Sequence, residues 1–456
     1  MGTEKTRRRR RKGAWSAAAV VALGAVVSAV AAGTGGAGGS ADPGWTETEC
    51  GTYSGKGCAP ASQRVDLEKP RFSNPTKITN PWFPISRLRS AVLLGKVDGQ
   101  PFRSETTLLP QAGAVAWDGK RVKVLLSQYT AYRNGRIEEV AIDRYAQADD
   151  GAVWYFGEDV VDYRNGTVAT TEGTWLAGRE GPPAMIMPAR PQVDDVFRPE
   201  NVIGIVFEEV EITEVGKLLA GPRGRVAGGV VARELHLDGT SSDKVFAPGY
   251  GEFFSGHEGN VEALAVGVPA DSVAGAAPAQ LDSLATSASG MLGSVRADDW
   301  EAARATLRRM NDAWKSLRAK RQLPLIAARL DSSLQTLGRA VRARKPARAG
   351  QTAIDVAQSV LDLALRYRSP VEIDRARFEL WCQQVLEHAA ARDRAGVRGD
   401  VATLEWIRDR FASTLDRSQA ADVDGRLRAL RTAADAGQLA AAGDHAARLI
   451  GRLRLM

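Results

Sequence analysis

Two different hydrophobic patterns follow each other along this chain. Between about residues 81 and 268, short runs rich in β-branched and aromatic residues, such as 122–126 and 153–156, alternate with turn signals. The turn signals are Asp-Gly and Asn-Gly pairs, which favour tight hairpins because both central positions need a positive φ. The spacing predicts an antiparallel β meander over residues 74–268, arranged as a half-barrel or a sandwich. The pairs begin at Asp98, Asp118, Asn134, Asp150 and Asn165.

The second pattern has a helical period. After a segment rich in alanine, proline and glycine at residues 269–280, apolar residues recur every three or four positions, as from Trp300 through Leu307 to Leu317. Pro324, Pro346 and the other prolines between these segments suit helix starts or breaks. We expect six to eight helices packed as a bundle. The predicted fold class is therefore α+β, with a β meander followed by an all-α bundle.

The helical part also suggests an internal repeat. The apolar pattern of residues 330–340 matches residues 423–433 at an offset of 93, and residues 295–298 resemble 397–400 at an offset of 102. Alanine-rich helices produce chance matches, so duplication is a hypothesis. It divides the bundle into halves at 281–368 and 369–456.

The first 32 residues have the layout of an export signal. Six basic residues, Arg7 to Lys12, precede an apolar stretch, and Ala29-Val30-Ala31 fits a peptidase cleavage pattern. The twin-arginine and the general secretory routes are both open. A retained anchor is the alternative, because about 19 apolar residues are just enough to span a bilayer. Either way, we expect the rest of the chain outside the cytoplasm, secreted or on the outer face of the cytoplasmic membrane.

Most of the net positive charge of the chain lies in the predicted export segment. The chain has a formal net charge of +7 and a pI near 9.3. Residues 1–31 contribute +6 of this, from seven basic residues and Glu4, which leaves about +1. A nearly neutral remainder gives no reason to expect nucleic-acid binding. Membrane contact is expected only through the N-terminal segment.

Residues 33–73 read as a flexible linker with one short loop. Glycine, alanine and serine dominate its start, and Cys50 and Cys58 flank a glycine-rich stretch. In an oxidising compartment these two cysteines are expected to pair.

Large apolar side chains in the β region suggest a binding surface. A curved sheet lined by them could shelter an apolar small molecule or lipid. The alternative is an ordinary core, since methionines and aromatics fill cores first. These candidates are Trp82, Trp154, Phe156, Trp175, Met185 and Met187.

Histidines offer two candidate metal sites. His388 follows the apolar face of its helix and could bind a metal with carboxylates from Glu387, Asp400 and Glu405; the alternative is a hydrogen-bonded core histidine. In the β region, the alternating row at 234, 236 and 238 (Glu, His, Asp) offers metal ligands but is more typical of the solvent face of an edge strand.

Catalytic patterns are missing from the sequence. There is no G-x-S-x-G elbow, no H-E-x-x-H helix and no phosphate-binding glycine loop. We therefore expect a protein that is not an enzyme, and an envelope hydrolase is the third alternative after the two binding functions given below. The sequence leaves any cofactor unknown.

Four short motifs in the β region resemble those of a family of exported bacterial β-domain proteins, of actinobacterial type and of unknown activity. The motifs are Asn80-Pro81-Trp82-Phe83-Pro84, the strand at 154–159, the I-M-P-A segment at 186–189 and the A-P-G-x-G-E ending at 247–252. The resemblance covers residues 74–265 and implies a curved half-barrel, similar to those that carry lipids or lipoproteins. The start of the helical part, Asp298 to Arg304, is similar to small helical domains of exported proteins.

Together these features predict a non-enzymatic exported cell-envelope protein. Its β domain would bind an apolar ligand or an envelope partner protein, and its helical bundle would mediate interaction. The alternative is an extracytoplasmic metal-handling protein with its site in the bundle.

Overall fold

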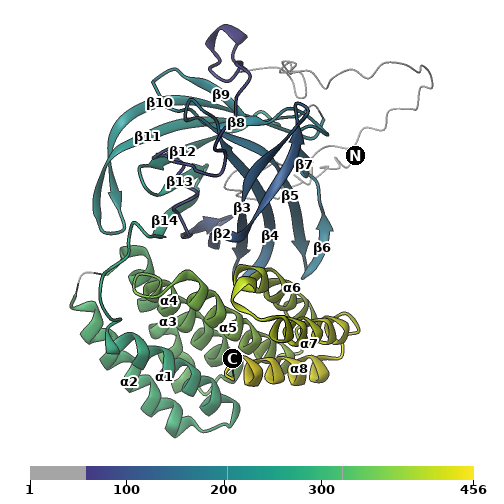
Figure 1. The fold of residues 1–456 in the computed structure, drawn as a ribbon. Coiled ribbons are helices and arrows are strands. Elements are labelled where there is room, and N and C mark those ends of the chain that lie inside the picture. The colour runs from purple at the N-terminus through teal and green to yellow at the C-terminus, as the bar shows by residue number, and fades with distance from the viewer. Residues whose placement is uncertain (1–57, 203, 321, 456) are drawn as a thin grey trace, which may run out of the picture.

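The computed structural model describes residues 58–202, 204–320 and 322–455. Within them the chain forms one antiparallel sheet of 14 strands and then eight α-helices (Figure 1). The predicted α+β class, with a β meander before a helical bundle, is confirmed. The predicted export segment and Cys50 lie outside the described residues. Cys58 is disulfide-bonded.

The strands run through the first half of the described chain. They are β1 (Ser90–Val97), β2 (Gln100–Trp117), β3 (Lys120–Arg133), β4 (Arg136–Gln147), β5 (Val153–Arg164), β6 (Thr167–Thr170), β7 (Trp175–Leu176), β8 (Ala184–Met187), β9 (Val196–Val202), β10 (Val206–Gly221), β11 (Gly224–His236), β12 (Ser241–Ala247), β13 (Gly251–His257) and β14 (Asn260–Val268).

The helices follow. They are α1 (Ala279–Arg296), α2 (Trp300–Arg318), α3 (Pro324–Arg342), α4 (Pro346–Ala364), α5 (Pro370–Ala390), α6 (Arg394–Arg410), α7 (Arg417–Asp435) and α8 (Leu439–Leu453). None of the helices in the described ranges combines the length and the apolar character that a bilayer crossing requires.

The sheet is a single curved layer. Its order is β6-β5-β4-β3-β2-β1-β14-β13-β12-β11-β10-β9, with β7 and β8 both paired to β5. Because β8 also packs beside β9, the two ends of the sheet approach each other around an interior (Figure 1). This arrangement corresponds to the half-barrel alternative and not to a sandwich of two sheets.

Four of the five predicted tight hairpins form as expected; at Asp150-Gly151 a five-residue loop joins β4 to β5, and only Gly151 has a positive φ (99°). At the turns beginning with Asp98, Asp118, Asn134 and Asn165, both central residues have positive φ, between 50° and 75°. This is the geometry of the primed turns that match the twist of the flanking strands. The residues at these turns therefore determine how most of the consecutive strands up to β6 are connected.

Helix starts also follow the local sequence. Proline occupies the first turn of α3, α4 and α5, where its missing N–H costs nothing. Ser369 caps α5 in a capping box with Glu372, and Asp416 caps α7 with Gln419. The eight helices agree with the expected six to eight.

The helices form two sets of four, α1–α4 and α5–α8, which have largely separate cores. Equivalent turns carry a residue with positive φ at 298 and 392, an offset of 94, and at 344 and 437, an offset of 93. These agree with the proposed offset of 93. The offset of 102 instead pairs residues 295–298, at the end of α1 and in the following turn, with residues 397–400 inside α6. These are not equivalent positions in the two sets of helices. The duplication itself stays a hypothesis.

The bundle packs against the outer face of the sheet. Apolar residues of β1 and β14, including Val92 and Val266, belong to the same buried core as α1–α4. A fully buried ionic network, here called the interface network, extends this contact to α4, α5 and α6. Its members are Arg103, Glu105, Asp362, Asp374, Arg377 and Arg410.

Candidate functional site

The concave face of the sheet carries a band of carboxyl groups. Strand register places the carboxyl residues of this band on the opposite face of the sheet from Arg103 and Glu105. Trp175 of β7 donates a hydrogen bond across the interior to Glu200 of β9 (3.3 Å). All but one of the carboxyl residues are buried, and the side chain of Glu252 is 13% exposed. The band comprises Glu139, Asp143, Glu158, Glu200, Glu208, Glu234, Glu252 and Glu262.

Burial dominates the chemistry of this band. It raises the pKa of Asp143 to about 7 and the pKa values of Glu200 and Glu262 to about 8, because a charged carboxylate is poorly solvated there. Near neutral pH a large part of the band is therefore protonated and can donate as well as accept hydrogen bonds.

The raised pKa of Glu262 predicts a pH-dependent contribution to stability that Glu262→Gln should remove. The folded state holds a proton on Glu262 up to about pH 8, whereas an unfolded glutamate releases it near pH 4.3. Wild-type stability should thus fall as pH rises from 5 to 8, by about 1 kcal/mol per pH unit for this group. Glutamine keeps an oxygen that can accept the 2.7 Å hydrogen bond from Ser104 but does not titrate.

Urea unfolding at pH 5 and pH 8 measures the effect. Glu258→Gln is the control, because the Glu258 side chain lies in the turn before β14 and is 82% exposed. Equal pH slopes for wild type and both variants would contradict the assignment.

A β-bulge in β5 positions two of the concave residues. Tyr155 pairs with Tyr145, whereas Glu158 pairs with Asp143, so the strand contains one extra residue between them. Gly157 lies in this bulge with a φ of 102°, and a Cβ there would lie 2.1 Å from the carbonyl oxygen of Trp175. Glycine therefore lets Tyr155 and Glu158 face the same side.

Next to the band lies a small pocket of mixed character. The cavity measures about 60 Å³ and opens into about 570 Å³ of atom-free space that includes open solvent. Its wall is mostly apolar and aromatic, with Thr106, Ser127, Asp143 and Glu252 as polar members. The Oγ atom of Ser127 is buried and has no hydrogen-bond partner within the described ranges. Apolar and aromatic members of the wall include Phe83, Leu93, Tyr129, Tyr145 and Tyr250.

Three of the four sequence motifs are joined to one another, and two of them line this pocket. The buried Asn80 side chain accepts hydrogen bonds from the backbone of Trp82 and Phe83 and donates one to the carbonyl of Pro188 (2.9 Å). Gly249 N–H donates to the carbonyl of Pro81 (2.8 Å). The N-P-W-F-P segment is thus fastened to the I-M-P-A and A-P-G-x-G-E segments, and the first and last of these contribute wall residues.

The predicted ligand-binding residues lie elsewhere. Five of them are buried in one large core cluster, and Trp82 is partly buried with its indole N–H donating to Gly228 (2.8 Å). None of the six lines the pocket described above. Their position corresponds to the core alternative. The five core residues are Trp154, Phe156, Trp175, Met185 and Met187.

Sequence reasoning missed the polar wall residues. Ser127 and Asp143 are direct neighbours across β3 and β4, but nothing in either strand marks them as a pair. One signal in the sequence could have indicated a polar interior. It is the run of polar residues inside a predicted strand, such as Ser104-Glu105-Thr106-Thr107.

The bundle site is only partly assembled. His388 Nδ1 lies 2.7 Å from Asp400 Oδ2, and its Nε2 lies 3.2 Å from the amide of Gln384. Glu387 instead pairs with Arg296 (2.8 Å), and Glu405 pairs with Arg431 (2.6 Å). The structure therefore brings two of the four predicted ligands together.

The expectation of a solvent face for the row in β11 is wrong. This strand lies inside the sheet between β10 and β12, so Glu234 is buried on the concave side. Asp238 lies in the following turn and accepts hydrogen bonds from Thr240 (2.7 and 3.0 Å). Alternation alone does not reveal which strands occupy the edge.

Comparison with protein-family models and with curated protein sequences finds no match to this chain. The resemblance to exported β-domain proteins stays a prediction.

Proposed function

We propose that this chain is an exported, non-enzymatic binding protein of the cell envelope. Its β domain would take up one end of a small apolar ligand that carries a single hydrogen-bonding group. The observation behind this proposal is the buried, unpartnered Oγ of Ser127 in an otherwise mainly apolar pocket. A buried hydroxyl without a partner is costly, and a ligand donor or acceptor would satisfy it.

The pocket also favours a particular ligand charge. Burial raises the pKa of Asp143 to about 7, and Glu252 is a second carboxyl group in the wall. In its ionised form, either carboxyl group repels an anionic ligand group and accepts a hydrogen bond from an alcohol or an amine. The size of the cavity suits one end of a ligand, with the remainder in the adjoining open space.

The helical bundle has a supporting role in this proposal. It covers the outer face of the sheet and leaves the concave face to the ligand. Its remaining surface would contact another envelope protein.

The direct test compares three eight-carbon probes with the purified protein. We expect 1-octanol and octylamine to raise the melting temperature and octanoate to leave it unchanged, because a ligand that binds only the folded state stabilises it. Ser127→Ala should weaken octanol binding about fivefold, in line with about 1 kcal/mol for one hydrogen bond.

Ser90→Ala is the matched control. Ser90 is also a buried strand serine whose hydroxyl has no partner in the described part of the chain, but it lies on the bundle side of β1. Equal losses in both variants, or equal stabilisation by all three probes, would exclude the pocket as the binding site.

A further inference from the structure

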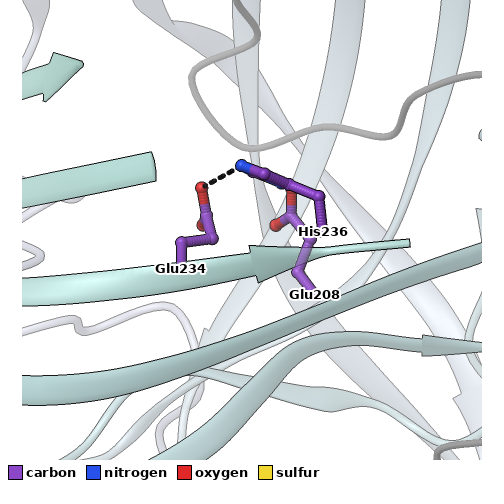
Figure 2. A group of neighbouring side chains, drawn as sticks. All are labelled: Glu208, Glu234 and His236. Carbon is purple, nitrogen blue, oxygen red and sulfur yellow. Dashed lines mark ion pairs between the residues drawn. The ribbon is translucent and has the colours of Figure 1, made fainter. Parts of the chain in front are cut away.

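A histidine and two carboxylates converge on the concave face, apart from the residues that line the pocket. Glu208 of β10 lies directly opposite His236 of β11, and Glu234 lies two residues before His236 on the same face. The three side chains point toward one another from the two neighbouring strands (Figure 2).

The distances suit a shared ion. His236 Nδ1 lies 3.5 Å from Glu208 Oε1, and the other ring nitrogen, Nε2, lies 3.8 Å from Glu234 Oε2. A single ion would use one of these two nitrogens. One ligand atom from each residue can be chosen so that all three lie within 4.8 Å of one another. Ligands about 2.1 Å from a tetrahedral zinc ion are about 3.4 Å apart, so closure requires shifts of about an ångström.

The charges around this group are not balanced by the protein. Lys244 is fully buried and faces Glu234 (3.2 Å) and Glu252 (3.5 Å). If Glu208, Glu234 and Glu252 are all ionised, Lys244 and a protonated His236 neutralise two of their three negative charges. Buried charges are normally paired or bound to metal, and a divalent cation would supply the missing charge.

A second observation points to a ligand. Glu208 is 1% exposed, and its Oε2 has no hydrogen-bond partner among the residues that the structure describes. This oxygen lies next to an imidazole and a second carboxylate, so it is available to coordinate a metal ion.

We propose that Glu208, Glu234 and His236 bind a divalent transition-metal ion, with Zn²⁺ as the first candidate. One imidazole and two carboxylates form a ligand set that suits zinc and leaves a fourth position open. Ser242 Oγ lies 3.0 Å from His236 Nε2 and 3.2 Å from Glu234 Oε2, and holds both groups in place. The His236 side chain is 18% exposed, which gives the ion an entry path.

Calorimetric titration of the chelator-treated protein with Zn²⁺ tests this site. We expect one equivalent to bind, and Glu208→Gln and His236→Ala to weaken binding at least tenfold. Glu208→Gln removes the charge but keeps the shape of the side chain, so a loss of metal binding can be told apart from a loss of folding. Circular dichroism checks that each variant is folded. Co²⁺ in place of Zn²⁺ gives a visible spectrum that should disappear in His236→Ala.

His388→Ala is the matched control, because it removes the histidine of the competing bundle site. Retained Zn²⁺ binding in this variant, together with loss in the other two, supports the proposal. Loss only in His388→Ala, equal binding in all variants, or no binding by the wild type would overturn it. The pocket assay with octanol is independent of these outcomes.

Discussion

Replacing Glu105 with glutamine should lower the free energy of unfolding by about 3–5 kcal/mol, the cost of breaking a buried ion-pair network. Glu105 contacts three arginines of the interface network: Arg103 (2.7 Å), Arg410 (2.5 Å) and Arg377 (3.5 Å). The network contains three acidic and three basic side chains, so the substitution leaves one buried positive charge without compensation.

The pKa of Glu105 reflects the same balance. Burial acts to raise it, but the three guanidinium groups outweigh burial and hold the pKa well below its usual range. A carboxylate with a lowered pKa contributes stability that is present above the unfolded pKa and is lost only as pH falls through the folded value. The variant should therefore be less stable than wild type throughout the range from pH 5 to pH 8.

Urea unfolding followed by circular dichroism measures this loss. Glu138→Gln in β4 is the matched control, because Glu138 pairs with Arg133 (2.7 Å) at a partly exposed position and should cost less than 1 kcal/mol. Similar losses in the two variants would show that the interface network does not stabilise the contact between sheet and bundle.

Trp175→Ala should also cost about 3–5 kcal/mol, as is typical of a large buried aromatic side chain. Trp175 is fully buried, its ring packs edge-on against Tyr155 at 5.5 Å, and its N–H donates to Glu200. Truncation would leave both a cavity and a buried carboxyl group without that donor. Thermal or urea unfolding measures the change.

Trp82→Ala serves as the comparison for Trp175→Ala. Trp82 is only partly buried, although its N–H also donates a hydrogen bond, so its truncation should cost less. If Trp175→Ala keeps wild-type stability but loses octanol binding, then Trp175 is a ligand contact, as the sequence suggested, and the core assignment is wrong.

Local chemistry explains why the architecture was predictable. Asp98-Gly99 and similar pairs define a hairpin within four residues, and proline with a capping residue defines a helix start within one turn. These signals depend only on neighbours in the chain. They predicted the meander and the bundle.

The concave face was not predictable for the opposite reason. Asp143 and Glu158 share a face because of the bulge at Gly157, and Trp175 reaches Glu200 because the two ends of the sheet come together. Both facts depend on strand register and curvature, which involve residues far apart in sequence. The alternating row at 234–238 predicts a solvent face, although Glu234 faces the interior.

The shared core of β1, β14 and the first four helices has a consequence for how the chain is made. The strands leave the ribosome first, yet Val92, Val266 and the charged groups of β2 also need partners in helices that are synthesised later. The β half alone therefore exposes apolar and charged side chains on its outer face until the helices have been synthesised and pack against it. A cut between residues 269 and 280 should accordingly yield two aggregation-prone pieces, and rejoining them in trans should restore solubility to both.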